Sequence, residues 1–384
     1  MSNLPKIAFN GVYLQKQASG LGVVSENLIS ELLNYEQKFD FRLYTADKDF
    51  KTQYPAIVNP ISPSITPDRG SLGHLKRLLW YQTSLNYHLK RQQTALFFSP
   101  AAEGMLFPWV PQIIMVHDLI PLKYPEVSPK WQYYYRYILP LILKSSRRII
   151  CISQHTKQDL IATYQLDPEL IDVIYLGFNR QLFYPQPDPQ ILAKYNLKKY
   201  FLYVGDMRFY KNLSRSLQAF DRLPIKDCQF VITGKKDDFF YPEIGRQVTQ
   251  LAAKERIIFL DYVPSEDLPG LYSQAQALVF PSLYEGFGLP VLEAMACGCP
   301  VITASATSIP EVGGDSALYV NPYDVDEIAQ GMSDLLTKAE LRKSLINLGL
   351  ERSQLFDWKQ TARRLNSIFD ECLQELGKDT REKT

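Results

Sequence analysis

A chain of 384 residues is too long for one typical hydrophobic core and fits two domains of roughly 150–200 residues each. With 46% hydrophobic and 22% charged residues, the composition is that of a soluble globular protein, and a net charge of +1 gives no whole-molecule reason to expect a nucleic-acid partner. Residues 1–180 carry 19 Lys and Arg against 14 Asp and Glu. The simplest interpretation of this mildly basic N-terminal half is ordinary surface charge. The second interpretation is a surface that favours an acidic acceptor or an anionic membrane face.

In chain order, short apolar runs occupy residues 7–9, 41–44, 96–98, 113–116, 149–152 and 173–175 in the first half, and 201–204, 230–233, 257–260, 278–280 and 301–303 in the second. Most of these runs are continuous rather than alternating, which is typical of parallel strands buried on both faces. Helical patterns such as residues 26–33, 214–220 and 325–337 separate them. The alternation predicts an α/β fold with two doubly wound domains.

The predicted boundary is a proline-rich segment. Residues 185–190 read Pro-Gln-Pro-Asp-Pro-Gln, a composition that favours a stiff, extended linker. We therefore expect an N-terminal domain over 1–184, the linker over 185–190, a C-terminal domain over 191–358 and a final helical segment over 359–384. In such folds, ligands bind at the carboxyl ends of the strands.

The cysteines and the N-terminus bear on location. Five cysteines, at positions 151, 228, 297, 299 and 372, form no CxxC motif and leave one unpaired, which favours reduced thiols. The first residues contain no hydrophobic signal region, and no apolar run approaches the ~18–20 residues that span a bilayer. We expect a cytoplasmic protein, with peripheral contact at the inner face of a membrane as a second interpretation. The oligomeric state stays open.

The first half contains two candidate ligand-binding segments. Ser19-Gly20-Leu21-Gly22 is a glycine-rich helix start after the first strand, a weak signal by itself. His117 directly follows the predicted strand 113–116, a position where a single histidine is usually structural. Trp131 opens an aromatic helix that could meet a carbohydrate or a membrane, although such helices more often only cover a sheet. The Lys76-Arg77 pair fits a solvated helix face best.

The second half contains the most informative segment. Glu285 and Glu293 flank two glycines and Pro290, after a buried strand. Pro290 fits the first turn of a helix, and Gly298 fits its C-terminal stop. We therefore expect a strand, an exposed glycine loop carrying Glu285, and a helix with Glu293 in its first turn. A helix start offers free N–H groups to a phosphate, and carboxylates hold sugar or ribose hydroxyls. The combination suits a nucleotide sugar.

The segment Glu285–Gly298, Glu-Gly-Phe-Gly-Leu-Pro-Val-Leu-Glu-Ala-Met-Ala-Cys-Gly, resembles the E-x7-E signature of the GT-B retaining glycosyltransferases of family 4, the group 1 glycosyltransferases. The resemblance extends over nearly the whole chain. It implies a GT-B fold: two Rossmann-like domains facing across a cleft, with the acceptor on the first domain and the nucleotide sugar held mainly by the second. It also implies that the final helix packs back on the first domain.

The resemblance assigns roles to particular residues. It implies that Glu285 holds the sugar hydroxyls, that His117 touches the transferred sugar, and that Arg208 and Lys211 hold the diphosphate and stabilise the leaving group. The expected donor-binding residues are Gly20, Gly22, Gly205, Tyr262, Val263, Gly286, Phe287, Gly288, Leu289 and Glu293. Many relatives read Arg-Lys-Asn without interruption, whereas here two residues separate Arg208 from Lys211. A pair at i and i+3 can still share a helix face.

The expected function is metal-independent, retaining transfer of a hexose from a nucleotide-diphosphate sugar, of the UDP-glucose type or GDP-mannose, to a glycan or lipid-linked acceptor in polysaccharide biosynthesis. We expect no cofactor and no metal site, since Arg208, Lys211 and helix N-termini would take the place of a cation. The alternatives are a GT-B-fold epimerase or phosphorylase, and a non-catalytic nucleotide-sugar-binding subunit. A nicotinamide dehydrogenase is disfavoured because no strand leads into GxGxxG.

Overall fold

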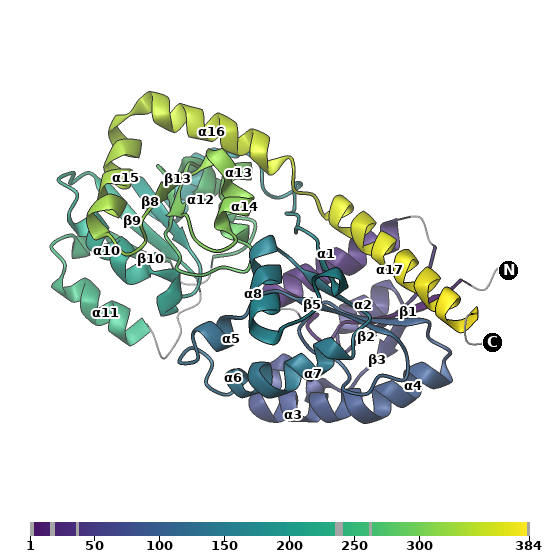
Figure 1. Cartoon of the computed structure of the whole chain (residues 1–384). Helices are drawn as coiled ribbons and strands as arrows, with labels where there is room; N and C mark the ends of the chain where they lie inside the picture. Colours follow the sequence, from purple (N-terminus) through teal and green to yellow (C-terminus); the bar gives the residue numbers. More distant parts are fainter. Residues whose placement is uncertain (1–3, 16–19, 36–37, 235–240, 261–262, 382–384) are drawn as a thin grey trace. The chain divides into compact units, whose positions relative to one another are not determined.

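The structure is a computed structural model that describes residues 4–15, 20–35, 38–234, 241–260 and 263–381 (Figure 1). The chain divides into two compact units, one formed by residues 1–177 and 358–384 and the other by residues 178–357. In this division residues 178–190 lie in the second unit, whereas the predicted first domain ends at 184 and the predicted stiff linker covers 185–190. Hydrogen bonds explain this: the Gln186 N–H donates to Ser273 at 2.9 Å, and the Gln274 side chain donates to the Asp188 carbonyl at 2.8 Å.

The first unit is built on a seven-stranded parallel sheet with the strand order β3-β2-β1-β4-β5-β6-β7. Its strands are β1 (Lys6–Asn10), β2 (Asp40–Thr45), β3 (Val58–Pro60), β4 (Leu96–Ser99), β5 (Gln112–Val116), β6 (Arg148–Cys151) and β7 (Ile171–Val173). Its helices are α1 (Gly20–Asn34), α2 (Lys48–Gln53), α3 (Gly70–Trp80), α4 (Asn86–Arg91), α5 (Ile120–Lys123), α6 (Trp131–Tyr133), α7 (Leu139–Lys144), α8 (Gln154–Tyr164) and α17 (Trp358–Arg381). Short π-helical turns join α3 to α4 and α6 to α7, so each pair forms one continuous helical run.

The second unit is built on a six-stranded parallel sheet with the order β10-β9-β8-β11-β12-β13. Its strands are β8 (Lys199–Val204), β9 (Cys228–Thr233), β10 (Ile257–Leu260), β11 (Leu278–Phe280), β12 (Val301–Ala304) and β13 (Leu318–Val320). Its helices are α9 (Pro189–Lys194), α10 (Leu213–Asp221), α11 (Tyr241–Gln250), α12 (Leu268–Gln274), α13 (Leu289–Ala296), α14 (Ile309–Gly313), α15 (Val325–Thr337) and α16 (Ala339–Ser353).

The predicted α/β class with two doubly wound sheets is confirmed. Central strands such as β4, β5 and β11 are buried along their whole length, as their continuous apolar sequences indicated. The strand order reverses between β1 and β4 in the first sheet and between β8 and β11 in the second. Ligands of open α/β sheets bind at the carboxyl edge of such switch points. The loops that follow β1, β8 and β11 are therefore candidate positions for a ligand-binding site.

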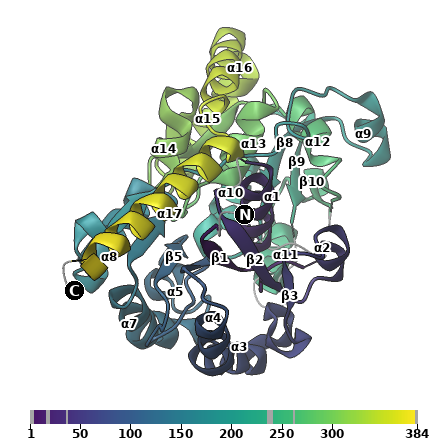
Figure 2. The same cartoon turned by 90° about the vertical axis from the view of Figure 1, so that its right-hand side faces the viewer.

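The C-terminal helix α17 belongs to the first unit, where the other elements are all N-terminal (Figure 2). Its Phe369 ring lies 5.4 Å from Phe98 of β4 and 6.0 Å from Phe39, measured between ring centroids. Thr361 donates a hydrogen bond to the Tyr175 carbonyl at 2.8 Å. Aromatic packing and this hydrogen bond hold α17 beside the strands of the first sheet.

Candidate active site

An ion pair joins the two loops that follow β8 and β11 in the second unit. Nζ of Lys211 donates to both carboxylate oxygens of Glu285, at 2.8 and 2.9 Å. The two side chains are largely buried, 15% and 8% exposed. The structure thus brings together two residues that the sequence singled out, 74 positions apart. It also pairs them directly, which the sequence does not predict.

Backbone hydrogen bonds hold these two loops together. The carbonyl of Tyr210 accepts from the N–H of Leu283 at 2.7 Å and from the hydroxyl of Ser282 at 3.1 Å. The side-chain amide of Asn212 donates to the carbonyls of Pro281 and Pro322, at 2.9 and 2.6 Å. The ion pair therefore rests on a backbone whose position is fixed on both sides.

Lys211 is held in its charged form. Burial by itself would lower the pKa of Lys211, but the nearby carboxylate of Glu285 outweighs it and leaves that pKa above its usual value. The rings of Phe280 and Tyr210 also face the ammonium, with centroids 5.2 and 5.6 Å from Nζ. The site thus contains a preformed cation at the switch point of the second sheet.

Arg208 has a different partner. Its Nε lies 3.4 Å from the carboxylate of Asp206 in the same loop, and its side chain is 37% exposed. Gly205, at the start of this loop, has φ of +152°, and a Cβ on Gly234 would lie 1.9 Å from the Gly205 carbonyl oxygen. The loops after β8 and β9 approach so closely that only glycine fits at 234. Glycine directly after a strand is a signal that could have identified Gly234.

The segment 286–289 leads into α13. Gly288 has φ of +107° and forms the N-cap of α13 without a side-chain cap, and Pro290 lies in the first turn as predicted. The loop is buried rather than exposed, because Phe287 packs against Phe356 with ring centroids 5.9 Å apart. Pro290 has no N–H, and the Val291 N–H donates to the Gly288 carbonyl at 3.0 Å, so the N–H of Leu289 is the donor of the first turn that is suited to an anion.

Glu293 is the fifth residue of α13 and lies in its second turn, so its predicted place in the first turn is wrong. The hydroxyl of Tyr272 on α12 lies 3.3 Å from Oε2 of Glu293. Burial raises the pKa of Glu293 to about 8, and the hydrogen bond from Tyr272 offsets this only in part. Glu293 is therefore mostly protonated at neutral pH in the ligand-free protein.

His117 lies in the first unit, directly after β5. Its Nε2 is 2.7 Å from the carbonyl oxygen of Pro100. Since a carbonyl only accepts, Nε2 carries the hydrogen and Nδ1 presents a lone pair. Burial lowers the pKa of His117 to about 4, and the hydrogen bond to Pro100 offsets this only in part. His117 is a neutral ring with a fixed tautomer at pH 7.

The remaining predicted donor residues have simpler settings. Gly20 is the first residue of α1 and Gly22 is buried within it. A Cβ at Gly20 would meet no described atom within 4 Å, so the packing of this part of the chain does not require glycine there. Val263 is buried in the second unit. Tyr262 lies outside the described residues.

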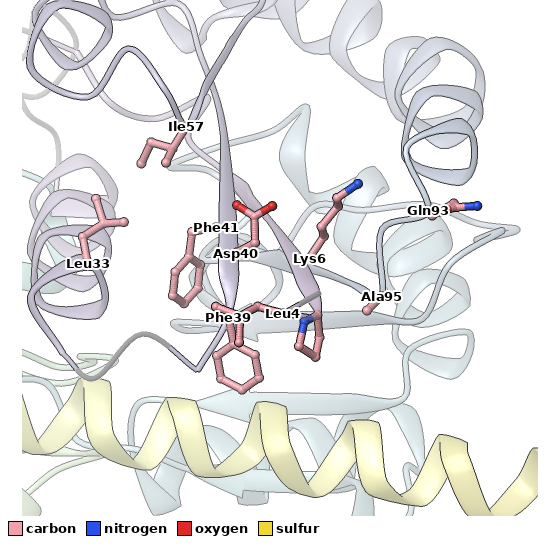
Figure 3. A pocket seen from close by; sticks show the side chains of 10 residues that line it. Leu4, Lys6, Leu33, Phe39, Asp40, Phe41, Ile57, Gln93 and Ala95 are labelled. Atoms are coloured by element: carbon pink, nitrogen blue, oxygen red, sulfur yellow. The ribbon is translucent and has the colours of Figure 1, made fainter. Parts of the chain in front are cut away.

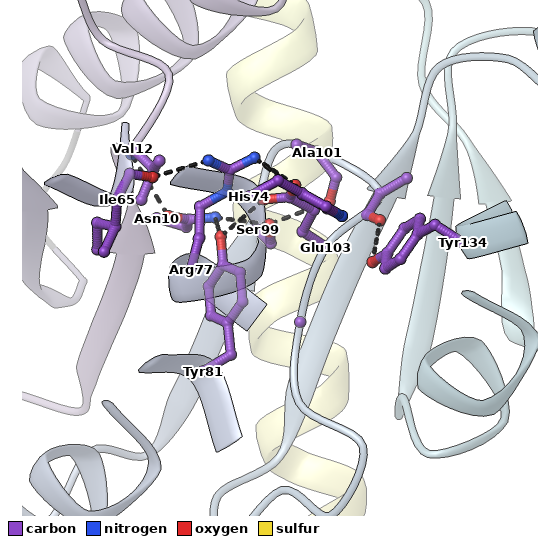
Figure 4. Close-up of polar contacts among 12 residues, drawn as sticks. Asn10, Val12, Ile65, His74, Arg77, Tyr81, Ser99, Ala101, Glu103 and Tyr134 are labelled. Carbon is purple, nitrogen blue, oxygen red and sulfur yellow. Dashed lines mark hydrogen bonds and ion pairs between the residues drawn. The ribbon is translucent and has the colours of Figure 1, made fainter. Parts of the chain in front are cut away.

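A buried polar cluster in the first unit is not predicted from the sequence (Figure 4). Arg77 of α3 donates from Nε and Nη2 to the two carboxylate oxygens of Glu103, at 2.6 and 2.7 Å, and from Nη1 to the Ile65 carbonyl at 2.7 Å. Tyr81 donates to Glu103 at 3.1 Å and accepts from the Asn10 side chain at 2.7 Å. The solvated helix face expected for Lys76-Arg77 is therefore wrong for Arg77, which is 1% exposed. No sequence pattern separates Arg77 from its neighbour.

A cavity of about 400 Å³ opens beside this cluster. His74 and Trp131 line it with ring centroids 4.2 Å apart, together with Tyr13, Ser71 and Lys130. These residues follow β1, β3 and β5, so the cavity lies at the carboxyl edge of the first sheet. Aromatic faces beside hydroxyl and ammonium groups are suited to a sugar ring.

A larger cavity of about 490 Å³ lies at the opposite edge of the same sheet (Figure 3). Residues at the amino ends of β1 and β2 line it, including Lys6, Phe39 and Asp40. It is remote from the carboxyl edge and contains none of the predicted site residues, so we assign it no part in the site.

The carboxylates do not suggest a metal centre. Among the described residues, no group of three or more His, Cys, Asp or Glu side chains is placed to hold a metal ion. The sequence contains two Asp-x-Asp triplets, 47–49 and 324–326, and each is explained by helix capping. Asp47 accepts from the first backbone N–H groups of α2, and Asp324 from those of α15. In the part of the chain that is described, no helix is long and apolar enough to cross a membrane.

The chain is similar to known proteins in both halves. Residues 18–182 match the family Glycosyltransferase Family 4, and residues 186–352 match the family Glycosyl transferases group 1. The O-antigen chain mannosyltransferase B of Escherichia coli is 30% identical over 383 residues, covering 94% of this chain and 99% of that protein. The O-antigen chain mannosyltransferase RfbU of Salmonella typhimurium is 31% identical over 266 residues, covering 68% and 72% of the two chains.

Solved structures support the same fold. The sucrose-phosphate synthase of Thermosynechococcus elongatus has a TM-score of 0.77 at 21% identity, covering 96% of this chain and 98% of that one. The Anabaena protein Alr3699/HepE, in complex with UDP and glucose, has a TM-score of 0.74 at 19% identity, covering 96% and 100%. The near full-length similarity to a mannosyltransferase, the matches to both families and the two parallel sheets agree: this chain belongs to the group 1 glycosyltransferases of family 4 and has the GT-B fold.

Proposed function

We propose that this glycosyltransferase moves a hexose from a nucleotide-diphosphate sugar to a glycan or lipid-linked acceptor, with retention of configuration and without a metal ion. The ion pair between Lys211 and Glu285 is the observation that carries the proposal. It places one cation and one carboxylate at the switch point of the second sheet, next to the start of α13. These are the groups that a sugar diphosphate requires.

The chemistry follows from the charge that develops during transfer. Breaking the bond between the sugar and the phosphate leaves negative charge on the diphosphate, which fixed cations and N–H dipoles stabilise more than they stabilise the bound donor. Lys211, Arg208 and the backbone N–H groups of residues 286–289 would supply these. When a donor binds, Lys211 would release Glu285 and donate to the diphosphate instead. Glu285 would then accept hydrogen bonds from the sugar hydroxyls. The acceptor hydroxyl would attack the anomeric carbon of the sugar from the face that the diphosphate leaves. An oxygen of the diphosphate would take the proton of that hydroxyl.

Two further residues fit substrate-binding roles. His117 has Nε2–H engaged by Pro100, so its Nδ1 would accept from a hydroxyl of the transferred sugar. Glu293 would bind the ribose through its carboxyl group, as the family resemblance implies. Neither role requires these residues to transfer a proton. The remaining predicted amides, at Gly20, Gly22, Gly205 and Gly286–Leu289, would approach the donor through the backbone.

Mannose is the sugar that we favour. The Escherichia coli relative that covers nearly the whole chain is an O-antigen chain mannosyltransferase, and so is RfbU of Salmonella typhimurium. The UDP-bound neighbour shares 19% identity and supports the fold alone. We therefore place the reaction in bacterial-type polysaccharide biosynthesis and assign the acceptor sugar to the cavity beside His74 and Trp131.

A donor screen tests the proposal. Thermal shift with GDP-mannose, UDP-glucose and the free nucleotides at millimolar concentration identifies the nucleotide, because a ligand at 100 times its Kd stabilises the fold by ~2.7 kcal/mol. Donor turnover is then followed with and without EDTA, and the anomeric configuration of the product by NMR. Loss of activity with EDTA, or an inverted product, would overturn those parts of the proposal. Isomerised donor without acceptor would indicate an epimerase, a requirement for free phosphate a phosphorylase, and binding without turnover a binding subunit.

A further inference from the structure

The first unit exposes an unusual number of large apolar side chains. Among the described residues, seventeen large hydrophobic side chains are exposed, and nine of them lie within residues 72–141. These nine are Leu72, Leu75, Leu79, Tyr87, Phe107, Trp109, Tyr133, Tyr137 and Leu141. Single exposed apolar residues need no explanation, but a concentration of them marks an interaction surface.

Most of the nine are spaced along two helical runs. Leu72, Leu75 and Leu79 recur at the helical period on α3, opposite the buried Gly73 and Arg77. In the same way, Tyr133, Tyr137 and Leu141 recur every four residues along the run from α6 to α7. The two runs lie side by side, because His74 of α3 contacts Trp131 and Tyr134, with ring centroids at 4.2 and 5.2 Å.

The loop before β5 extends this surface. Asn86 of α4 donates to the Phe107 carbonyl at 2.8 Å and accepts from the Trp109 N–H at 2.8 Å, which fixes the loop against α4. Lys90 lies over the Trp109 ring, 5.2 Å from its centroid. Phe107 is 81% exposed, the largest value among the seventeen. Figure 1 shows α3, α4, α6 and α7 gathered on one side of the first unit.

The charge on this surface is predominantly positive. Residues 69–102 and 127–158 contain no Asp or Glu, and Glu103 is buried on Arg77. The exposed basic residues of α3, α4, α6 and α7 and their flanks are Arg69, Lys76, Lys90, Arg91, Lys130, Arg136 and Lys144, against two exposed acidic residues at the flanks, Asp68 and Glu126. These basic residues contribute to the excess of 19 Lys and Arg over 14 Asp and Glu in residues 1–180.

We propose that this basic apolar surface, formed by α3, α4, α6, α7 and the loop at 107–109, docks the protein on an anionic lipid bilayer. Leu and Phe side chains enter the boundary of the acyl chains, Trp and Tyr lie at headgroup level, and Lys and Arg contact anionic headgroups. A second copy of the chain is a poor occupant, because a two-fold contact would place these like charges against each other. The surface lies on the first unit alone and does not depend on the donor chemistry proposed above.

Vesicle flotation with the full-length protein tests this surface. We expect the protein to float with vesicles of phosphatidylcholine containing phosphatidylglycerol, to float poorly with phosphatidylcholine alone, and to be released as salt rises. The variant Lys76→Gln/Arg136→Gln should weaken partitioning about 30-fold, if each charge near the surface contributes as in other basic proteins. Leu75→Ser/Tyr137→Ser should weaken binding to a similar extent. Each altered side chain is exposed, and unchanged thermal melting confirms that the variants fold.

The matched controls lie on the second unit. Lys254→Gln/Lys343→Gln removes two exposed charges, and Leu355→Ser removes a 61% exposed leucine. We expect both to float like the parent protein. Failure to bind anionic vesicles, or equal loss in the control variants, would overturn the proposal. So would light scattering that finds an oligomer dissociated by Leu75→Ser/Tyr137→Ser, since the surface would then be an interface between copies.

Discussion

Lys211 donates to both carboxylate oxygens of Glu285, at 2.8 and 2.9 Å, so the ligand-free site is closed on itself by an ion pair. The pair satisfies two largely buried charges that would otherwise be unfavourable. If Lys211 and Glu285 bind the donor as proposed, donor binding would have to compete with this ion pair. The diphosphate would replace Glu285 as the partner of Lys211, and the sugar hydroxyls would replace Lys211 as the partners of Glu285.

Replacing Lys211 separates its structural and catalytic roles. Lys211→Met should lower the free energy of unfolding by about 3 kcal/mol, because it leaves the Glu285 carboxylate buried without its partner. It should also lower kcat about 100-fold or more, as for loss of one charge stabiliser. Urea unfolding and initial rates measure the two effects.

The double variant Lys211→Met/Glu285→Leu is the control for that experiment. Replacing both members of a buried pair by apolar residues is often neutral for stability, so this variant should regain most of the lost stability. Its activity should stay low. Recovery of activity along with stability would mean that Lys211 acts only through the fold.

Glu293 makes stability depend on pH. Its pKa is about 8 in the folded protein, against a usual value of 4.5. The folded state therefore holds a proton that the unfolded state has lost between these values. The stabilisation from this group is complete below pH 4.5 and is lost as the pH rises through about 8. Glu293→Gln should flatten the decline in stability between pH 5 and 9, measured by urea unfolding. An unchanged slope would place the responsible group elsewhere.

The sequence predicts the two sheets well because buried parallel strands are continuous apolar runs. It does not predict β3 (Val58–Pro60) or β13 (Leu318–Val320), two three-residue strands that pair only at the edges of their sheets. It identifies Lys211 and Glu285 separately through motifs, but their ion pair depends on two loops meeting in space. Burial of Phe287 on Phe356 and of Arg77 on Glu103 likewise depends on distant segments. The local sequence around each of these residues does not indicate which distant segment it will contact.

His117 should not contribute an ionisation to catalysis near neutral pH. Its pKa is about 4, and its Nε2–H is held by Pro100. We expect His117→Ala to lower kcat while leaving the shape of the pH–rate profile between pH 6 and 9 unchanged. His117→Asn, which keeps a polar side chain of similar reach, should retain more activity. A profile that loses a limb with apparent pKa near 7 in His117→Ala would show that the histidine titrates in the reaction.

Because the folded pKa of His117 is below its usual value of 6.5, this residue also affects acid stability. Between pH 6.5 and 4, His117 is protonated in the unfolded chain but not in the folded chain. The stabilisation is therefore complete above pH 6.5 and is lost as the pH falls through about 4. The slope has the opposite sign to that of Glu293, so unfolding at pH 4 to 6 in His117→Ala separates the two groups.

Trp131 offers a test of the acceptor cavity. Its ring lines the cavity beside His74, where it can cover the apolar face of a pyranose. Trp131→Ala should raise the acceptor KM about tenfold, which corresponds to ~1.4 kcal/mol of lost binding. Hydrolysis of the donor in the absence of acceptor should stay unchanged, since the donor groups lie on other loops. Tyr175→Ala is the control, because Tyr175 is a 40% exposed aromatic residue of the first unit that lies outside both the cavity lining and the surface proposed to dock on membranes. If Trp131→Ala slowed donor hydrolysis as much as transfer, the cavity would belong to the donor; if the acceptor KM stayed the same in both variants, the acceptor would bind elsewhere on the protein.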